Sequence, residues 1–266
     1  MSEVLELERH GAVAEVRLNR PERHNALDWP LFQALVEVGE SLAAQADVRA
    51  VVLAGNGPSF CSGLDYPAMM AVPEAFREGF TRAEGAEANR VQQAAWVWKR
   101  MPVPVIAAVH GACFGGGIQL ALAADIRLAH AQARLSVMEI KWGLVPDMTG
   151  TATLRELVRL DVAKELTYSG CIVEGTEAAQ LGLVTRVVDE PLEAARALAA
   201  DIAGRNPDAI RRAKQLFAAN WQEPQAAAAL AREQEHQLAL LGSENQREAA
   251  TAALEKRPPR FRDSQA

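Results

Sequence analysis

The first half of the chain contains apolar patterns typical of strands. Residues 4–8 and 13–18 place apolar side chains at alternate positions, and His10-Gly11 separates them, which predicts a hairpin. Residues 48–53 predict another strand, and the β-branched apolar run 103–109 predicts a buried one. The sequence therefore predicts a sheet that begins with a hairpin and continues with strands further along the chain.

Helical patterns follow these strands and dominate the last third of the chain. Asp28 stands where it can cap a helix over residues 29 to about 44, and residues 74–100 predict a helical stretch with a polar first half. Short strands are predicted at 126–129 and 133–136, and a loop over residues 138–151 follows them. Helical segments then dominate to residue 254. Strands that alternate with helices predict an α/β core with crossover connections.

The stretch from residue 103 to residue 119 leads from a buried strand directly into three consecutive glycines. His110 and Gly111 turn the chain, residues 115–117 are the glycines, and a good helix-forming run follows them. A strand, a glycine turn and a helix N-terminus together offer free backbone N–H groups to an oxygen anion. A close-packed turn between a strand and a crossing helix is the alternative interpretation.

The composition limits the kinds of molecule that the protein is expected to bind. The 266 residues include 28 Lys and Arg against 34 Asp and Glu, a net charge of −6. This balance disfavours a nucleic-acid groove but permits an anionic small molecule bound by a local basic cluster. No apolar run approaches the roughly 18 residues of a membrane span, and the charged N-terminal residues are unlike a signal peptide. We therefore expect a cytoplasmic protein that binds neither nucleic acid nor membrane.

Most familiar catalytic motifs are absent from the sequence. The glycines lack the spacing of a dinucleotide fingerprint or a P-loop, no serine lies in a nucleophile elbow, and the five histidines form no ligand pair. Cys61, Cys113 and Cys171 have no metal-ligand spacing, so we predict no metal site. Cys61 and Cys113 are interpreted as small buried thiols, because no base is evident near either.

Two glycine loops and two acids remain as candidate chemistry. The loops are residues 61–65 and 115–117, and Glu139 and Asp147 follow the second loop along the chain. Two convergent N–H groups can hold the oxygen of a thioester as it becomes an enolate. A nearby carboxylate can then move the α or γ proton.

Four segments in this order resemble the crotonase superfamily, the enoyl-CoA hydratase/isomerase family, over essentially the whole chain. They are LNRPERHNAL at 18–27, FCSGLD at 60–65, HGACFGGG at 110–117 and QLGLV at 180–184. The resemblance implies an α/β fold, the ClpP-like crotonase spiral of β-β-α turns with a helical C-terminal region. It also implies a homotrimer or a dimer of trimers.

The resemblance divides the chain and assigns roles to residues. Residues 1–200 would form the core for acyl-CoA binding and catalysis, and residues 201–266 would serve oligomerisation and cover CoA. The N–H groups of Leu64 and Gly116 would form the oxyanion hole. Further substrate-binding positions are Arg23, His24, Ala26, Gly63, Asp65, Gly115 and Lys256. Arg23 and Lys256 would meet the CoA phosphates, Lys256 from a neighbouring subunit. No cofactor is expected, because coenzyme A is part of the substrate.

Three positions bear on the type of reaction. Hydratases of this family hold a water with two glutamates; the first position is Gln119 here, and the second is Glu139. An amide cannot transfer protons as a carboxylate does, but it can orient a neighbour. Asp147 resembles the second acid of dienoyl-CoA isomerases, although those enzymes have aspartate at the position of Gln119. Asp147 also fits the N-cap of a helix beginning near Met148, and both roles stay open.

We therefore expect an enzyme that acts on acyl-CoA thioesters through an enolate, with Glu139 as the main acid/base. Gln119 would orient Glu139 or a water, and Asp147 would supply a second proton relay. Isomerisation is favoured because one hydratase glutamate is missing, and enoyl-CoA hydration in acyl-CoA degradation is the alternative. Hydrolase or dehalogenase chemistry would need a carboxylate nucleophile, and a non-catalytic acyl-CoA binder would show affinity without turnover.

Overall fold

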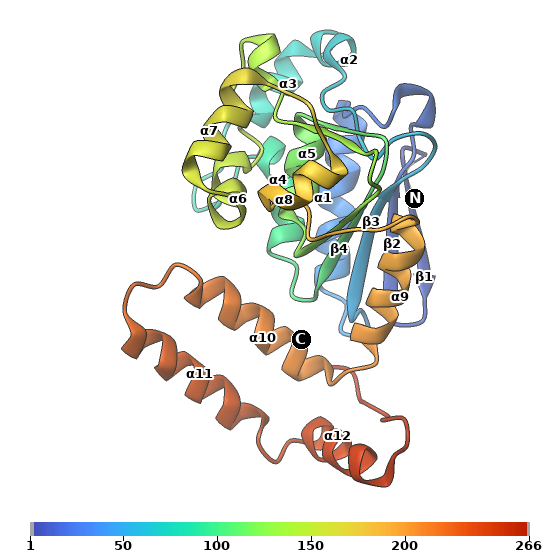
Figure 1. Ribbon diagram of the computed structural model, residues 1–266, viewed down its shortest axis with the longest axis vertical. Helices are drawn as coiled ribbons and strands as arrows, with labels where there is room; N and C mark the ends of the chain where they lie inside the picture. The colour runs from blue at the N-terminus through green and yellow to red at the C-terminus, as the bar shows by residue number, and fades with distance from the viewer. Residues whose placement is uncertain (1–2, 265–266) are drawn as a thin grey trace.

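The computed structural model describes residues 3–264 and has a six-stranded sheet at its centre (Figure 1). Residues 1, 2, 265 and 266, which the expected division of the chain includes, lie outside the described residues. The strands in spatial order are β1 (Leu5–His10), β2 (Val13–Leu18), β3 (Ala50–Gly55), β4 (Val105–Val109), β6 (Ile126–Ala129) and β9 (Arg186–Val187). The predicted hairpin is confirmed, since β1 and β2 pair antiparallel, and the later neighbours pair parallel.

A second, three-stranded sheet lies beside the first and carries part of the site. Its strands are β5 (Ala112–Phe114), β7 (Arg134–Ser136) and β8 (Val173–Glu174). The β5 strand directly follows the turn after β4 and was not predicted, because only three residues separate that turn from the first of the three glycines. It pairs parallel with β7, and β7 pairs antiparallel with β8.

Helices lie around the central sheet and beyond one end of it (Figure 1). They are α1 (Trp29–Ala43), α2 (Tyr66–Met70), α3 (Pro73–Gly79), α4 (Arg90–Lys99), α5 (Gly116–Ala123), α6 (Gly150–Leu157), α7 (Leu160–Ser169), α8 (Gly175–Leu181), α9 (Pro191–Ala203), α10 (Pro207–Asn220), α11 (Ala226–Leu240) and α12 (Glu244–Glu255), with short 3-10 helices η1 (Pro21–Arg23) and η2 (Glu139–Trp142). None of the helices in the described part of the chain is long and apolar enough to cross a membrane.

The central strands are continuous apolar runs because both of their faces are buried. Val51 and Leu53 of β3 join the larger core, which also contains buried residues of α1, α4 and α5. Val52 of β3 and Ile106 of β4 belong to a second core under α9 on the opposite face. The sheet therefore lies between two apolar cores, and loops extend from the ends of its strands.

Local signals predict α1 well and the region after Leu64 poorly. Asp28 caps α1, since its Oδ1 accepts a hydrogen bond of 2.9 Å from the Leu31 N–H. The single helical stretch predicted over 74–100 is wrong, because residues 80–89 lie between two separate helices. Gly85 has a φ of +76° in that gap, and Asn89 starts α4 afresh with a capping box.

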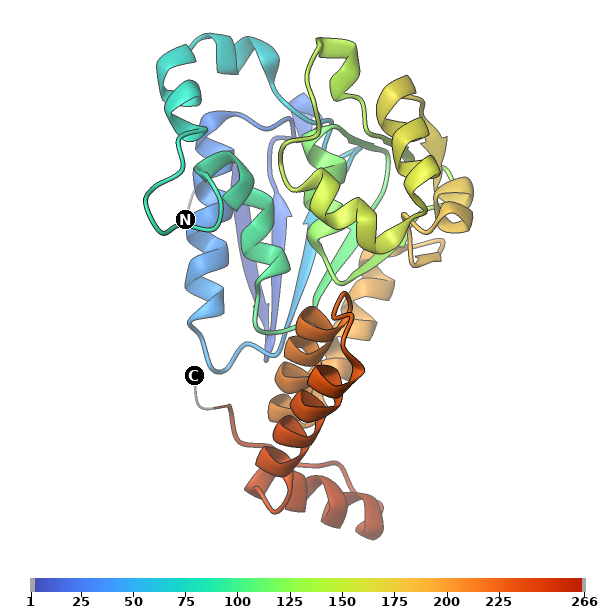
Figure 2. The same cartoon turned by 90° about the vertical axis from the view of Figure 1, so that its left-hand side faces the viewer.

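The last three helices extend away from the sheet. Figures 1 and 2 both show α10–α12 (orange to red) beyond one end of the strands, opposite the end that carries α2. The C-terminal tail returns to the core, where Arg49 Nη2 donates to Phe261 O at 3.1 Å and to Asp263 Oδ1 at 2.8 Å. Ser264 Oγ donates to Asp208 Oδ1 at 2.7 Å, which fixes the tail against α10.

Candidate active site

The two glycine loops singled out in the sequence lie directly against each other. Cys61 and Cys113 form a parallel bridge, in which the Cys61 N–H donates to Ala112 O and the Phe114 N–H donates to Cys61 O, both at 3.0 Å. Gly63 has a φ of +93°, and a Cβ there would lie 2.7 Å from Phe114 O. Only glycine allows this approach, so the close contact of the loops depends on Gly63.

Each loop contains a backbone N–H, at Leu64 and at Gly116, for which residues 3–264 provide no acceptor. Gly116 is the first residue of α5, so its N–H has no partner within the helix. Leu64 pairs with Leu27 through neighbouring groups: the Leu27 N–H donates to Gly63 O at 2.7 Å, and the Asp65 N–H donates to Leu27 O at 3.0 Å. The N–H groups of Leu64 and Gly116 are therefore available as a pair of donors.

Gln119 and Glu139 form a buried hydrogen-bonded pair beside these donors. Gln119 Nε2 donates to Glu139 Oε1 at 2.5 Å, and Gln119 Oε1 accepts from the Gly150 N–H at 2.9 Å. Glu139 Oε1 lies 3.5 Å from the position of a Cβ on Gly115. Glu139 is only 8% exposed, and its Oε2 is buried with no hydrogen-bond partner in the described residues. The carboxylate therefore has one oxygen held by Gln119 and one buried oxygen that no described residue hydrogen-bonds.

Burial raises the pKa of Glu139 above its ordinary value. The nearby charge of Asp147 acts in the same direction, whereas the hydrogen bond from Gln119 partly opposes the shift. Burial also raises the pKa of Asp147. A carboxylate with a raised pKa is a stronger base, so both groups are better suited to proton transfer than solvated acids.

Asp147 does not cap a helix, which corrects one of its two predicted roles. Helix α6 begins at Gly150, its N-cap residue is Thr149, and no side chain caps it. Thr149 has a φ of +76°, which is unusual for a β-branched residue. Its hydroxyl is buried without a hydrogen-bond partner in the part of the chain that the structure describes. The sequence did not single out Thr149, because a left-handed backbone is signalled by glycine or asparagine rather than by threonine.

The early loop is attached to the first glycine loop by an arginine that the sequence analysis did not single out. Arg20 Nη2 lies 3.0 Å from Asp65 Oδ2 and 3.1 Å from Asp28 Oδ2, and Arg20 Nη1 donates to the carbonyl of Ala26. Asp65 Oδ1 also caps α2 by accepting from the Ala68 N–H at 3.2 Å. Asp65 and Ala26, both predicted to bind substrate, thus have contacts that hold the loops together.

The other predicted substrate-binding residues are dispersed. Arg23 and His24 are exposed on the early loop, and His24 Nδ1 lies 2.9 Å from Ser59 Oγ. Lys256 is exposed at the C-terminal end of α12, with a φ of +54°. Because α12 lies beyond the opposite end of the sheet from α2 (Figure 1), one chain does not bring Lys256 to the glycine loops.

The buried cysteines are not candidate nucleophiles. Cys61 and Cys113 are both fully buried, as predicted. Burial raises the pKa of Cys61 to about 12, and burial also raises that of Cys113. A thiol at such a pKa is almost entirely protonated near neutral pH, so neither is a reactive thiolate.

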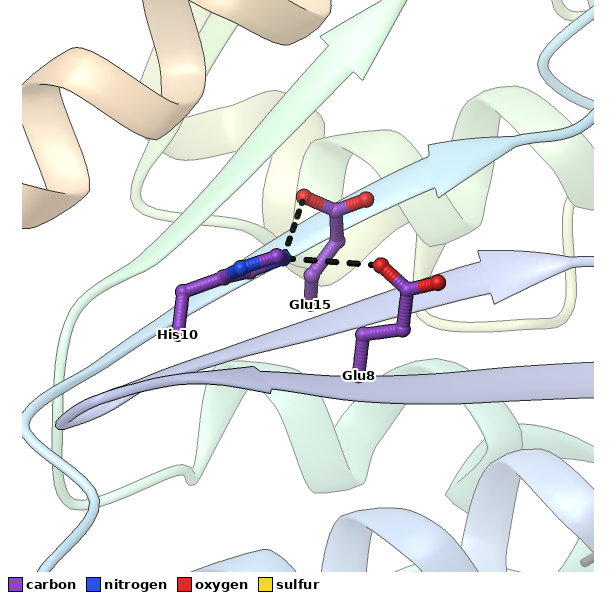
Figure 3. Close-up of side chains that lie close together, drawn as sticks. All are labelled: Glu8, His10 and Glu15. Atoms are coloured by element: carbon purple, nitrogen blue, oxygen red, sulfur yellow. Dashed lines mark ion pairs between the residues drawn. The ribbon is translucent and has the colours of Figure 1, made fainter.

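Glu8, His10 and Glu15 form a group of potential metal ligands on the hairpin, with ligand atoms within 4.8 Å of one another (Figure 3). Glu15, however, accepts from Arg196 at 2.6 and 2.8 Å and from Arg17 at 2.9 Å. Burial alone would raise the pKa of Glu15, but Arg196 and Arg17 outweigh it and lower the pKa. Arg17 also binds Glu8 at 2.6 Å. We interpret the group as an ion-pair network that holds β2 against α9.

The chain is similar in sequence to known proteins over most of its length. A family model described as enoyl-CoA hydratase/isomerase matches residues 8–264. The mitochondrial Delta(3,5)-Delta(2,4)-dienoyl-CoA isomerase of Mus musculus is 36% identical over 220 residues, which are 76% of this chain and 64% of that protein. The chain thus spans about two thirds of the length of that relative. The short-chain-enoyl-CoA hydratase of Clostridium acetobutylicum is 34% identical, over 94% of each chain.

Solved structures support the fold. The structure of a putative enoyl-CoA hydratase from Streptomyces coelicolor A3(2) has a TM-score of 0.89 at 33% identity, covering 98% of this chain and 95% of that one. An enoyl-CoA hydratase from Bacillus anthracis has a TM-score of 0.87 at 28% identity, covering 97% and 98%. The crotonase fold expected from the sequence is therefore confirmed.

Proposed function

The chain belongs to the enoyl-CoA hydratase/isomerase family, and from this membership we propose that it isomerises a double bond in enoyl-CoA thioesters through an enolate. We prefer isomerisation to hydration because two hydrogen bonds fix the side-chain amide of Gln119 beside Glu139. The amide accepts from the Gly150 N–H and donates to Glu139. The site therefore has a positioned carboxylate at Glu139 and a neutral group beside it.

The proposed reaction uses the paired donors and the free oxygen of Glu139. The thioester oxygen would accept hydrogen bonds from the N–H groups of Leu64 and Gly116. Glu139 Oε2 would take a proton from one carbon of the acyl chain, and the electron pair would move toward the thioester oxygen to form an enolate. The same proton would return to a different carbon, so the double bond shifts and no atom is gained or lost.

Asp147 is proposed as a second proton-transfer group for dienoyl substrates. Its charge acts on the pKa of Glu139, and burial raises its own pKa, as a proton relay needs. The correction of its capping role removes the structural explanation for an aspartate at this position. The name of the mouse relative, a dienoyl-CoA isomerase, is consistent with this role.

Hydration of 2-enoyl-CoA is the second candidate. It is favoured by the Clostridium acetobutylicum relative, a short-chain-enoyl-CoA hydratase that matches 94% of this chain. Glu139 alone would then have to activate the water. We rank hydration second because Gln119 cannot act as the second proton donor or acceptor.

We propose that CoA binding and assembly use exposed groups at the two ends of the chain. Arg23 and Lys256 would meet the CoA phosphates, Lys256 from a neighbouring subunit. The assembly would be a homotrimer or a dimer of trimers, with α10–α12 packed on neighbours. This region has large exposed apolar side chains, namely Phe217, Trp221, Leu230, Leu238, Leu241 and Leu254.

Charge reversal of Arg23 or Lys256 should raise KM most at low salt. Unchanged KM in both variants would exclude this placement.

Two conservative variants test the proposed roles of the acids. Glu139→Gln keeps the shape of the side chain and removes the base, so it should abolish turnover of every enoyl-CoA substrate. Asp147→Asn should slow isomerisation of 3,5-dienoyl-CoA and spare that of 3-enoyl-CoA. If Glu139→Gln turns over at the wild-type rate, the assignment of the base is wrong. An equal effect of Asp147→Asn on both substrates would remove Asp147 from the relay.

A further inference from the structure

An aromatic pair joins the two segments that carry the candidate catalytic groups. Tyr66 is the first residue of α2, and Trp142 is the last residue of η2. Their ring centroids are 5.3 Å apart and their planes are inclined by only 17°, so the rings are stacked. The stack therefore links the chain after Leu64 to the chain after Glu139.

Both rings lie close to the reacting groups along the backbone. Tyr66 follows Leu64 by two residues, so their Cα atoms are at most about 7 Å apart. Trp142 follows Glu139 by three residues of 3-10 helix, which is about 6 Å along the helix axis. An acyl chain whose thioester is held at Leu64 and whose reacting carbons face Glu139 has its tail within reach of this stack.

The stack is exposed, and so are large apolar side chains next to it along the chain. Tyr66 is 43% exposed and Trp142 is 60% exposed. Met70 on α2 and Leu144 and Val145 after η2 are also large exposed apolar side chains. These five residues define what we call the aromatic wall. The helices α10–α12 of the same chain lie at the opposite end of the molecule (Figure 1), so they do not cover it.

We propose that the aromatic wall binds the distal part of the acyl chain and makes the site selective for apolar acyl groups longer than four carbons. This inference rests on the proposed function only in that the thioester must bind at Leu64 and Gly116. Exposed apolar surface beside a ligand site is a common binding surface. Two rings stacked on each other are also already ordered, so binding a tail to them costs little side-chain entropy.

Binding of saturated thioesters tests the wall without requiring any reaction. Affinities of wild-type protein for butyryl-CoA and octanoyl-CoA are measured by calorimetry. Each methylene that is fully buried strengthens binding about four-fold. Since the wall is partly exposed, we expect octanoyl-CoA to bind about ten-fold more tightly than butyryl-CoA. Trp142→Ala and Tyr66→Ala should reduce this ratio to about three or less and leave the affinity for butyryl-CoA nearly unchanged.

Three further variants serve as controls. Trp142→Phe and Tyr66→Phe keep a ring and should retain the wild-type ratio, which guards against an effect of misfolding. Tyr168→Ala removes an exposed ring from α7, away from the proposed subunit contacts, and should also retain it. A ratio near one in wild-type protein, or an unchanged ratio in both alanine variants, would overturn the proposal. Loss of the assembly in Trp142→Ala, measured by light scattering, would overturn it too, because the wall would then be a subunit contact.

The binding measurements, combined with an assay of enoyl-CoA turnover, separate this proposal from the proposed function. Selective binding of octanoyl-CoA by a protein that converts no enoyl-CoA would support the wall and refute the isomerase assignment. Isomerisation of enoyl-CoA together with equal affinity for both saturated thioesters would support the isomerase assignment and refute the wall. No affinity for either thioester would refute both.

Discussion

Gln119 donates a hydrogen bond of 2.5 Å to Glu139 Oε1, while Glu139 Oε2 is a buried oxygen without a hydrogen-bond partner among residues 3–264. The Gly150 N–H fixes the direction of the amide, because it can donate only to the amide oxygen. A Cβ on Gly150 would lie 2.7 Å from that oxygen, so a glycine is needed at this contact. The geometry thus selects which oxygen of Glu139 is available for proton transfer.

The first prediction concerns the identity of residue 119. Gln119→Leu removes both hydrogen bonds and frees the Glu139 side chain, so kcat for isomerisation should fall on the order of 100-fold. Gln119→Glu instead supplies a second carboxylate and should create or raise hydration of 2-enoyl-CoA. Steady-state kinetics with both substrates check this. Gln119→Leu with wild-type kcat would show that the orientation of Glu139 does not matter.

The second prediction concerns pH. If ionised Glu139 is the base, kcat/KM rises with pH through its pKa, and burial places that pKa above the ordinary value of 4.5. The acidic limb of the profile should therefore lie at higher pH than for a solvated glutamate. Gln119→Leu removes a hydrogen bond that lowers the pKa of Glu139, so it should move the limb further up. A limb that moves down in this variant, in protein shown by circular dichroism to be folded, would contradict the assignment.

The third prediction concerns the donor at Gly116. A Cβ there would lie 2.8 Å from Leu27 Cδ1 and 3.0 Å from Met148 Sδ, both ends of flexible side chains. Gly116→Ala should therefore fold but disturb the N–H, with a loss on the order of 100- to 1,000-fold in kcat. In Gly117→Ala the Cβ would collide with the backbone of Cys61, so this control should lose stability instead. Wild-type kcat in folded Gly116→Ala would exclude Gly116 as an oxyanion donor.

The fourth prediction concerns the backbone at Thr149. Non-glycine residues in the left-handed region cost on the order of 1–3 kcal/mol, and Thr149 also buries a hydroxyl that no other described residue hydrogen-bonds. Thr149→Gly removes the backbone strain and the buried hydroxyl. The glycine loses more conformational freedom on folding, which costs about 1 kcal/mol. The substitution should raise the free energy of unfolding by about 1 kcal/mol. Thr149→Ala keeps the strained backbone, so denaturant unfolding should rank it below the glycine variant; the opposite order would contradict this explanation.

Local features of the fold could be predicted from the sequence. The hairpin and the Asp28 cap depend on neighbouring residues, so they are visible in the sequence itself. The break at residues 80–89 was missed because the signals of Gly85 and Asn89 are weaker than the surrounding helical pattern. Asp147 was considered as a cap because aspartate commonly caps helices. The left-handed Thr149 that moves the helix start to Gly150 has no signal in the sequence.

The candidate site, too, could be predicted from the sequence only in part. The family resemblance selected Leu64, Gly116, Gln119 and Glu139, which the structure brings to adjoining loops and helices; their catalytic roles stay predictions. The stacking of Tyr66 on Trp142 joins residues far apart in the chain, and no local pattern indicates it. Contacts of this kind depend on how distant segments fold together.

The most direct test of the central claim is product analysis of wild-type protein in water labelled with oxygen-18. The substrates are 2-enoyl-, 3-enoyl- and 3,5-dienoyl-CoA, and the readouts are product mass and ultraviolet absorbance. The proposed mechanism predicts a shifted double bond in the 3-enoyl and 3,5-dienoyl substrates, with no change of mass and no label. Rapid addition of labelled water to 2-enoyl-CoA, with no shift of a double bond in either other substrate, would contradict it.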